Sequence, residues 1–159
     1  MGATPSASST GKDPVPYGTE LHATRYQYGF VLTPEELHDK KRALDVVDGI
    51  VSLSNVAGNQ IRFLFDFAPE SIIFRLTDDF APRMLYGFAL DEDCNLTIPE
   101  IIQRIESGDL DPRELIVGGL ISGTEHGEKL KEKNASVFAG VKEAAEEAKK
   151  RMKEALKLT

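Results

Sequence analysis

The stretch TRYQYGFVLTPEEL, residues 24–37, carries the pattern from which the fold is predicted. Its first half is typical of a strand with one buried face, because large apolar residues occupy every second position: Tyr26, Tyr28, Phe30 and Leu32. A helix start follows at once. Thr33 suits the N-cap, Pro34 the first helical position, and Glu36 can complete a capping box. A half-buried strand leading directly into a helix is therefore expected.

The helix is expected to run over about residues 34–56, with Gly58 at the left-handed position that often ends a helix. Beyond this turn the period changes to two. Residues 61–67 place aromatic side chains at alternate positions, and residues 71–76 resume the alternation after Pro69. We expect these two runs to form one bent strand or two short strands.

The remaining sequence adds four elements. Residues 84–90 form a further expected strand, and a second capping box at Thr97 predicts a helix that ends at Gly108. Residues 113–121 predict a last strand, and an amphipathic helix is expected from about Asn134. The resulting order, β-α-β-β-α-β-α, predicts an α+β protein with a ferredoxin-like or modified RNA-recognition fold.

The 159 residues are enough for one domain with a core of its own. Residues 1–16 are rich in Ser, Thr, Gly, Ala and Pro, so we expect a flexible leader there. The α/β sandwich domain is expected over residues 17–126. Residues 127–159 are expected to form the C-terminal amphipathic helix, packed on or beside that domain.

The chain is acidic, with a net charge of −7 and a pI near 5.0. Nucleic-acid affinity comes largely from Lys and Arg at phosphates, so this charge disfavours simple electrostatic binding. No apolar run approaches the roughly 20 residues that cross a bilayer, and the start has no signal-peptide order. A cytoplasmic protein without membrane contact is expected.

Enzyme and metal chemistry find little support in the residue pattern. The histidines, His22, His38 and His126, lack the spacing of a helical metal pair, and Cys94 has no second cysteine to pair with. No nucleophile-elbow motif or phosphate-binding loop occurs in the sequence. We therefore expect no metal, no cofactor and no catalytic activity.

The turn after the first helix is the most suggestive stretch for binding. Its small residues would let the main chain approach a phosphate, with candidate contacts at Asn55, Gly58, Asn59, Gln60 and Arg62. The same residues also fit a helix C-cap followed by a surface arginine. The aromatic run at 62–67 is likewise open to two interpretations, a base-stacking strand or a core strand.

Three stretches together resemble a known family: TRYQYGF at 24–30, GNQIRFL at 58–64 and SIIFRL at 71–76. They are similar to the C-terminal half of DevR-type CRISPR-associated autoregulators. The resemblance covers about residues 22–86 and continues more weakly through the final helix. Members of this family are about twice as long as this chain.

The resemblance implies a function. DevR-type proteins are repeated, non-catalytic backbone subunits of type I Cascade effector complexes, built on a modified RNA-recognition fold. Expected partners are therefore the guide RNA (crRNA), copies of the chain itself and other Cascade subunits. The loop after the long helix faces RNA in the family, which makes Gly58, Asn59, Gln60 and Arg62 expected RNA contacts.

Two alternatives remain open at the level of sequence. One is a structural or dimerisation domain that does not touch RNA, which the acidic charge favours. The other is a ribonuclease acting through Asp66 or His22, because related backbone subunits of other CRISPR types cut RNA through an aspartate. The second is the weaker, since no acid and base can be placed together.

Overall fold

The computed structural model describes residues 2–3, 16–17, 25–53 and 67–158. The chain divides into two compact units. One comprises Met1–Tyr26 with Asn55–Asp66, and the other comprises Gln27–Ser54 with Phe67–Thr159. In the first unit, strands β1 (Gly2–Ala3) and β2 (Pro16–Tyr17) pair antiparallel. The elements described below all belong to the second unit.

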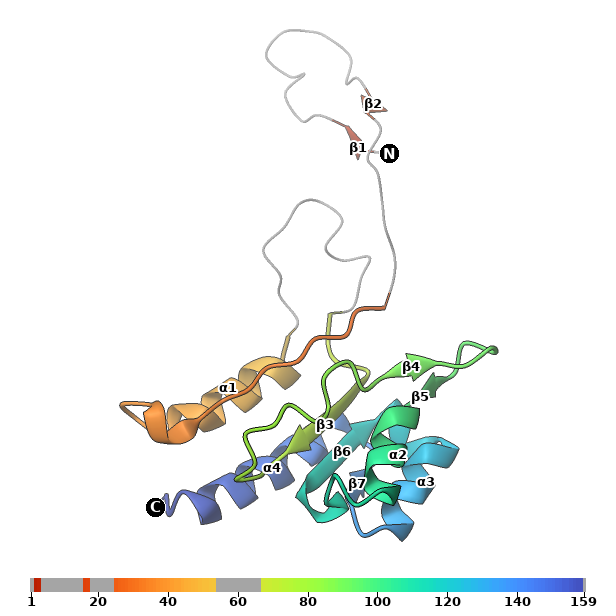
Figure 1. Cartoon of the computed structure of the whole chain (residues 1–159). Helices are drawn as coiled ribbons and strands as arrows, with labels where there is room; N and C mark the ends of the chain where they lie inside the picture. The colour runs from red at the N-terminus through yellow and green to blue at the C-terminus, as the bar shows by residue number, and fades with distance from the viewer. Residues whose placement is uncertain (1, 4–15, 18–24, 54–66, 159) are drawn as a thin grey trace, which may run out of the picture. The chain divides into compact units, whose positions relative to one another are not determined.

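A three-stranded sheet forms the centre of the second unit (Figure 1). Strand β6 (Leu115–Gly119) lies in the middle, antiparallel to β3 (Ser71–Arg75) and parallel to β7 (Ser136–Phe138). Helix α3 (Glu125–Glu132) lies between β6 and β7 in the sequence, so β6-α3-β7 is a parallel crossover unit. All five residues of β6 are buried, as expected for a central strand covered on both faces.

Helices cover both faces of this sheet. Leu115 and Val117 of β6 pack into a core with α2 (Pro99–Glu106) and α3. Ile116 points the opposite way, into a second core formed with α1 (Arg42–Val51) and α4 (Val141–Ala155). This alternation follows from the two-residue period of a strand. The result is a helix–sheet–helix arrangement with two separate apolar layers.

Shorter elements connect these parts. Strands β4 (Ala89–Leu90) and β5 (Leu96–Thr97) pair antiparallel and precede α2. Single turns of 3₁₀ helix occur at η2 (Pro34–Glu36), η4 (Pro112–Glu114) and η5 (Leu120–Gly123). In the part of the chain that the structure describes, no helix is both long and apolar enough to span a membrane.

The two glycines that end β6 are required by packing. A Cβ atom at Gly118 would lie 2.6 Å from Ala144 Cβ and 2.6 Å from the Gly140 carbonyl oxygen, so its absence lets α4 approach the sheet. Gly119 has φ +93°, and a Cβ there would lie 2.1 Å from the Glu70 carbonyl oxygen. Glycines usually weaken a strand, but here the structure uses them for close approach.

The expected strand at 26–32 is wrong. Residues 25–33 form neither strand nor helix, and Tyr28 and Phe30 are 56% and 54% exposed. An alternating pattern forms a strand only when a neighbour pairs with it, and no described strand lies along this segment.

The expected helix over 34–56 is shorter than the pattern indicates. Thr33 accepts no capping hydrogen bond, and the chain makes only the turn η2 before α1 begins at Arg42. The Asp39 carboxylate accepts a hydrogen bond from the Lys41 amide at 3.0 Å, which stabilises a bend between η2 and α1. Residues 54–66 lie outside the described part of the chain. The expected strand at 61–67 is therefore not tested, since only its last residue, Phe67, is described.

Towards the C-terminus the outcome is mixed. The strand at 71–76 and the helix that begins at Pro99 are confirmed as β3 and α2. The capping box at Thr97 is wrong, because Thr97 lies in β5 and the N-cap is Ile98, which makes no side-chain capping bond. The strand expected at 113–121 is the shorter β6.

The strand expected at 84–90 reduces to β4, because Tyr86 takes a left-handed φ of 54°. The helix expected from Asn134 begins at Val141, after β7, and the sequence pattern does not predict α3. The α+β class therefore agrees with the structure, whereas the ferredoxin-like order is not confirmed.

Candidate functional site

The predicted RNA contacts all lie outside the described residues. This applies to Asn55, Gly58, Asn59, Gln60 and Arg62 alike. The described elements on either side of them are α1 and β3. Helix α1 ends at Val51, which is buried against α4, and β3 begins at Ser71. The role of the loop in binding therefore stays a prediction.

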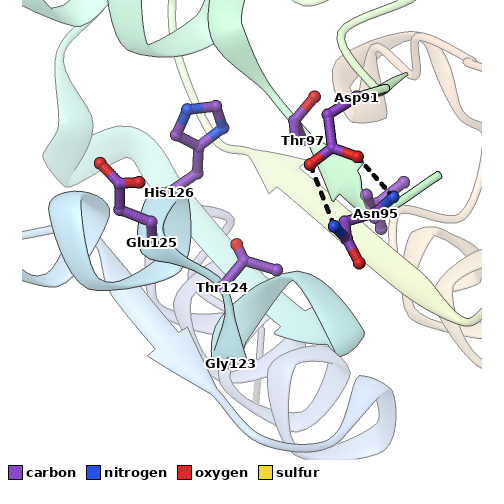
Figure 2. Close-up of a pocket in the computed structure, with 8 residues that line it drawn as sticks. Asp91, Asn95, Thr97, Gly123, Thr124, Glu125 and His126 are labelled. Carbon is purple, nitrogen blue, oxygen red and sulfur yellow. Dashed lines mark hydrogen bonds between the residues drawn. The ribbon is translucent and has the colours of Figure 1, made fainter. Parts of the chain in front are cut away.

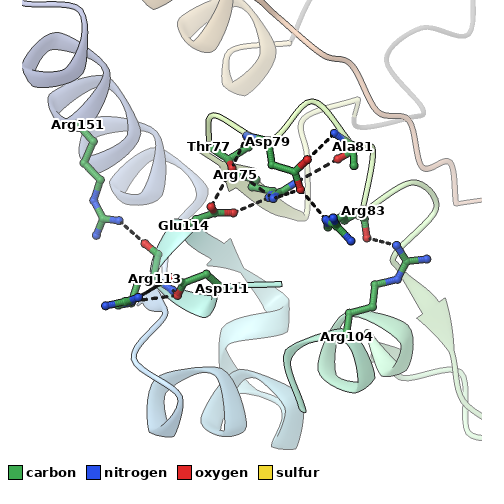
Figure 3. A network of polar contacts seen from close by, with 10 residues as sticks. All are labelled: Arg75, Thr77, Asp79, Ala81, Arg83, Arg104, Asp111, Arg113, Glu114 and Arg151. Carbon is green, nitrogen blue, oxygen red and sulfur yellow. Dashed lines mark hydrogen bonds and ion pairs between the residues drawn. The ribbon is translucent and has the colours of Figure 1, made fainter. Parts of the chain in front are cut away.

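A polar network holds the end of β3 to neighbouring segments (Figure 3). The Arg75 side chain is only 9% exposed. Its Nε donates to Glu114 Oε2 at 2.7 Å, its Nη1 to the Ala81 carbonyl at 3.0 Å, and its Nη2 to Asp79 Oδ2 at 3.1 Å. A guanidinium offers five donors in a fixed plane, so one side chain can connect η4 with the loop after β3.

Asp79 stands between two arginines of this network. Arg83 Nε donates to its Oδ2 at 2.6 Å, and the Ala81 amide donates to Oδ1 at 2.9 Å. These bonds hold the pKa of the Asp79 carboxyl far below its usual value. The bond from Arg83 has the largest effect, followed by those from the Ala81 amide and from Arg75. The positive charges of Arg75 and Arg83 are thus used inside the protein, which makes them poor candidates for phosphate contacts.

The basic run at the start of α1 is not held in ion pairs in this way. Within residues 25–53, the exposed side chains of Lys40, Lys41 and Arg42 form no ion pair. Acidic residues balance them nearby, however, at Glu35, Glu36 and Asp39. The local charge is therefore close to zero, and these residues alone do not form a basic patch.

A polar cleft of about 370 Å³ opens between the β4–β5 hairpin and the start of α3 (Figure 2). His126 lies at its wall, and its Nδ1 accepts the Ile98 amide proton at 2.8 Å. Neutral His126 therefore carries its proton on Nε2. Burial, and to a lesser extent Lys129, lowers the pKa of this imidazole, while Glu125 acts in the opposite direction.

Two further polar side chains of the cleft, those of Thr124 and Asp91, are also engaged. The Thr124 hydroxyl donates to the Ile121 carbonyl at 2.8 Å and accepts the Gly127 amide proton at 3.3 Å, so it caps α3. The Asp91 carboxylate accepts bonds from the Asn95 amide and from the Asn95 side chain, which hold the hairpin turn and lower the pKa of Asp91. The cleft therefore contains capping and turn contacts and no hydroxyl paired with a base.

The described residues also give no support for a metal site. Over residues 25–53 and 67–158, no group of three or more His, Cys, Asp or Glu side chains is arranged to hold an ion. Cys94 is exposed, and His38 is exposed before α1, far along the chain from His126.

Sequence reasoning missed the contacts that join distant segments. His126 and Ile98 are 28 residues apart, and Arg75 and Glu114 are 39 apart. No local spacing signals such pairs, because they form only once the sheet brings their elements together. The pattern of the aromatic segment at 27–32 is conspicuous in the sequence, but it indicates a buried strand where the structure has an exposed segment.

Comparison with known proteins assigns the class. The sequence matches no protein-family model. It is 46% identical over 155 residues, 95% of this chain, to the "CRISPR-associated protein Cas7/Cst2/DevR" of Myxococcus xanthus strain DK1622. This degree of identity over nearly the whole chain defines a CRISPR-associated protein. More narrowly, it confirms the predicted resemblance: the chain belongs to the DevR-type family. It spans about half the length of this relative, 51%.

Proposed function

We propose that this chain is the C-terminal portion of a guide-RNA-binding, non-catalytic backbone subunit of a CRISPR antiviral effector complex. The observation that carries the proposal is the 46% identity, over 95% of the chain, to a CRISPR-associated protein. Under this proposal its partners are the guide RNA, copies of itself and other subunits of the complex. A cytoplasmic location belongs to the same proposal.

The proposed RNA contacts remain the residues of the turn after α1. Gly58 and Asn59 would let the main chain approach the RNA backbone, and Arg62 would supply a charge to a phosphate. Contacts of this kind fix position and carry little base specificity. They are consistent with an RNA that presents a different guide sequence in every complex.

The described side chains support a role without catalysis. The hydroxyl of Thr124 and the Nδ1 atom of His126 already hold structural hydrogen bonds. Asp66 and His22, the residues of the ribonuclease alternative, lie outside the described residues, so they are tested by substitution. Neither Asp66→Asn nor His22→Ala should change the integrity of a bound RNA.

The test is recovery of RNA from the chain purified after co-expression with a CRISPR array. We expect guide-length RNA in the purified fraction, and less of it with Arg62→Ala at equal protein yield. Lys133→Ala, an exposed cation at the end of α3, is the matched control and should leave recovery unchanged. Equal recovery with both variants would overturn the assignment of Arg62, and no guide RNA with any of them would overturn the proposed function.

The alternative of a protein-interaction domain is favoured by one observation. The segment at 27–32 exposes apolar side chains without a basic surround, which suits a protein surface better than a phosphate backbone. The two functions are compatible, because a backbone subunit must also contact other protein chains.

A further inference from the structure

The end of helix α4 is basic in an otherwise acidic chain. Residues 149–158 contain five Lys or Arg and one Glu, which gives them a net charge of +4. Since the whole chain carries −7, the remaining residues carry −11. A charge asymmetry of this size within one chain indicates a local surface for an anionic partner.

Two of the five cations hold the helix in place. The Lys149 side chain is 14% exposed and donates to the Asp48 carboxylate on α1 at 2.6 Å. Arg151 donates to Glu147 at 2.8 Å and to the Arg113 carbonyl at 3.1 Å (Figure 3). These two charges are thus used within the protein and are poor candidates for contact with a partner.

The other three cations are exposed. The Lys150 side chain is 67% exposed, and its ammonium lies 3.9 Å from Glu147, beyond hydrogen-bond distance. In the described part of the chain, Lys153 and Lys157 form no ion pair. Lys150 and Lys153 are three residues apart and so share one face of α4, and Lys157 follows its last turn. We call Lys150, Lys153 and Lys157 the α4 lysine surface.

The main chain holds Lys157 in a conformation that usually belongs to glycine. The Lys157 amide donates to the Glu154 carbonyl at 3.3 Å, and the Leu158 amide donates to the Lys153 carbonyl at 3.0 Å. These are the two bonds of a Schellman motif, and Lys157 takes a left-handed φ of 53°. A Cβ atom makes this conformation unfavourable. A lysine here therefore lowers stability, and such a cost is common where a residue serves binding.

The helix dipole explains only part of this arrangement. Cations near the last turn of a helix are stabilised by the partial negative charge of its free carbonyl groups. This effect suits Lys153 and Lys157, because α4 ends at Ala155. It falls off within one turn, and Lys150 lies more than one turn before the end. The dipole therefore does not account for the whole surface.

We propose that the α4 lysine surface contacts the phosphate backbone of RNA, in addition to the turn after α1. The inference rests on the proposed function and adds a second contact surface to it. A lysine ammonium is a point charge on a flexible stem, so it can follow a phosphate without a fixed orientation. Contacts of this kind carry no base specificity.

Other partners fit this surface less well. Protein interfaces have an apolar centre and few lysines, and residues 141–158 expose no large apolar side chain. Helices that bind a membrane surface expose an apolar face. The apolar face of α4, with Ala144, Ala145 and Ala148, is instead buried in the core that it forms with α1 and the sheet. A phosphate backbone requires only the exposed charges.

The test compares two double variants that share a net charge of −9, because each removes two positive charges from the chain. Lys153→Gln with Lys157→Gln changes the α4 lysine surface. Lys133→Gln with Lys142→Gln, the control, removes exposed charges at the end of α3 and the start of α4. Fluorescence anisotropy with a labelled single-stranded RNA of mixed sequence is measured over a salt series.

The control should keep the affinity and the salt slope of the parent chain. The variant of the α4 lysine surface should bind more weakly, with a slope flatter by about 1.4, since each cation on a single strand contributes about 0.7. Equal binding by the two variants would overturn the inference. Weaker binding with Arg62→Ala and unchanged binding with the α4 variant would overturn it and leave the proposed function standing. A parent chain that binds no RNA at low salt would overturn both.

Two further outcomes would assign the surface to another partner. The first is binding to phosphatidylserine vesicles that the α4 variant loses while its RNA binding is unchanged, which would indicate a lipid surface. The second is self-association in sedimentation that only the α4 variant loses, again with unchanged RNA binding, which would indicate contact between copies of the chain.

A single substitution separates binding from stability. Lys157→Gly places the usual residue in the left-handed position, so the melting temperature should stay the same or rise while RNA binding weakens. A lysine that serves only the helix end would give the opposite result, a lower melting temperature with unchanged RNA binding. That result would overturn the assignment of Lys157.

Discussion

Arg75 and Glu114 are bonded at 2.7 Å, Nε to Oε2, across the ends of two antiparallel strands, and they are 39 residues apart in sequence. Arg75 is the last residue of β3, and Glu114 is the last residue of η4, directly before β6. The pair therefore joins the end of β3 to the start of β6. Arg75→Ala should lower the free energy of unfolding by about 2–4 kcal/mol, below the cost for a fully buried pair because Glu114 is 27% exposed. Arg113→Ala, at an arginine that is 78% exposed, is the control and should hardly change the urea midpoint. Equal midpoints for the two variants would show that the network adds nothing to stability.

Gly119 gives a second prediction. Its φ of +93° and the Glu70 carbonyl oxygen leave no room for a Cβ atom. Gly119→Ala should therefore destabilise the protein by at least about 2 kcal/mol in thermal or urea unfolding. Gly123→Ala should be tolerated, since a Cβ there meets no atom within 4 Å. A tolerated Gly119→Ala would contradict the described end of β6.

The two threonines before helical turns should behave differently. Thr124 accepts the Gly127 amide proton and caps α3, so Thr124→Ala should cost about 1 kcal/mol. Thr33 makes no such bond, so Thr33→Ala should leave the melting temperature nearly unchanged. Calorimetry of the two variants compares their melting temperatures. A larger decrease for Thr33→Ala than for Thr124→Ala would support the capping box that the sequence predicts at Thr33.

His126 should make stability depend on pH. Its pKa in the folded protein is lowered, so the unfolded chain binds a proton first as the pH falls. The stabilisation is complete above about pH 6.5 and is lost as the pH falls through the folded pKa. Protonation at Nδ1 also removes the acceptor of the Ile98 amide. Glu125 and Lys129 on α3, and Asp91 across the cleft, are the charged groups near this ring.

The measurement is urea unfolding at a series of pH values that spans the ordinary histidine pKa of about 6.5. His126→Asn keeps an acceptor near the position of Nδ1 but does not titrate, so its stability should fall less across this range than that of the parent chain. His38→Asn removes an exposed histidine and should keep the parent profile. Identical profiles for the parent chain and His126→Asn would mean that another group causes the acid sensitivity.

RNA binding should be weak in this acidic chain and should fall steeply with salt. If Arg62 contacts a phosphate, Arg62→Ala should weaken binding to all single-stranded RNA sequences alike and flatten the salt slope by about one unit. Fluorescence anisotropy over a salt series measures both, and the same substitution at the aligned residue of the longer relative gives a higher affinity from which to start. An unchanged slope there would leave Arg62 as a surface arginine after a helix cap.

What could be predicted from the sequence was local. The alternation of residues 71–76 and the Pro99 start were enough to predict β3 and α2, because each element is encoded within its own few residues. The segment at 27–32 has an equally strong pattern, but a strand also needs a partner, which the pattern does not contain. Strand β7 was missed because three residues at 136–138 lie within a stretch that also suits a helix.

The candidate sites divide in the same way. The turn at 55–62 was selected by residue type and family resemblance, both readable from sequence. The Gln27–Phe88 and His126–Ile98 pairs depend on distances that only the folded chain sets, since their members are 61 and 28 residues apart. Sequence alone gives the chemical character of such residues but not their neighbours.

The alternating side chains of β6 have a consequence for how the protein opens. Val117 belongs to the layer of α2 and α3, and Ile116 to the layer of α1 and α4, so the two layers meet only through the sheet. We therefore expect that either layer can detach while the other keeps its packing, which would give two partly unfolded forms below global unfolding. Three of the seven buried residues of the α1–α4 layer are alanines, Ala144, Ala145 and Ala148, whereas the α2–α3 layer has one alanine among ten. Because a small side chain buries little apolar area, we expect the α1–α4 layer to be the less stable of the two. It should be the first to open, and proteases should cut there before they reach the other side.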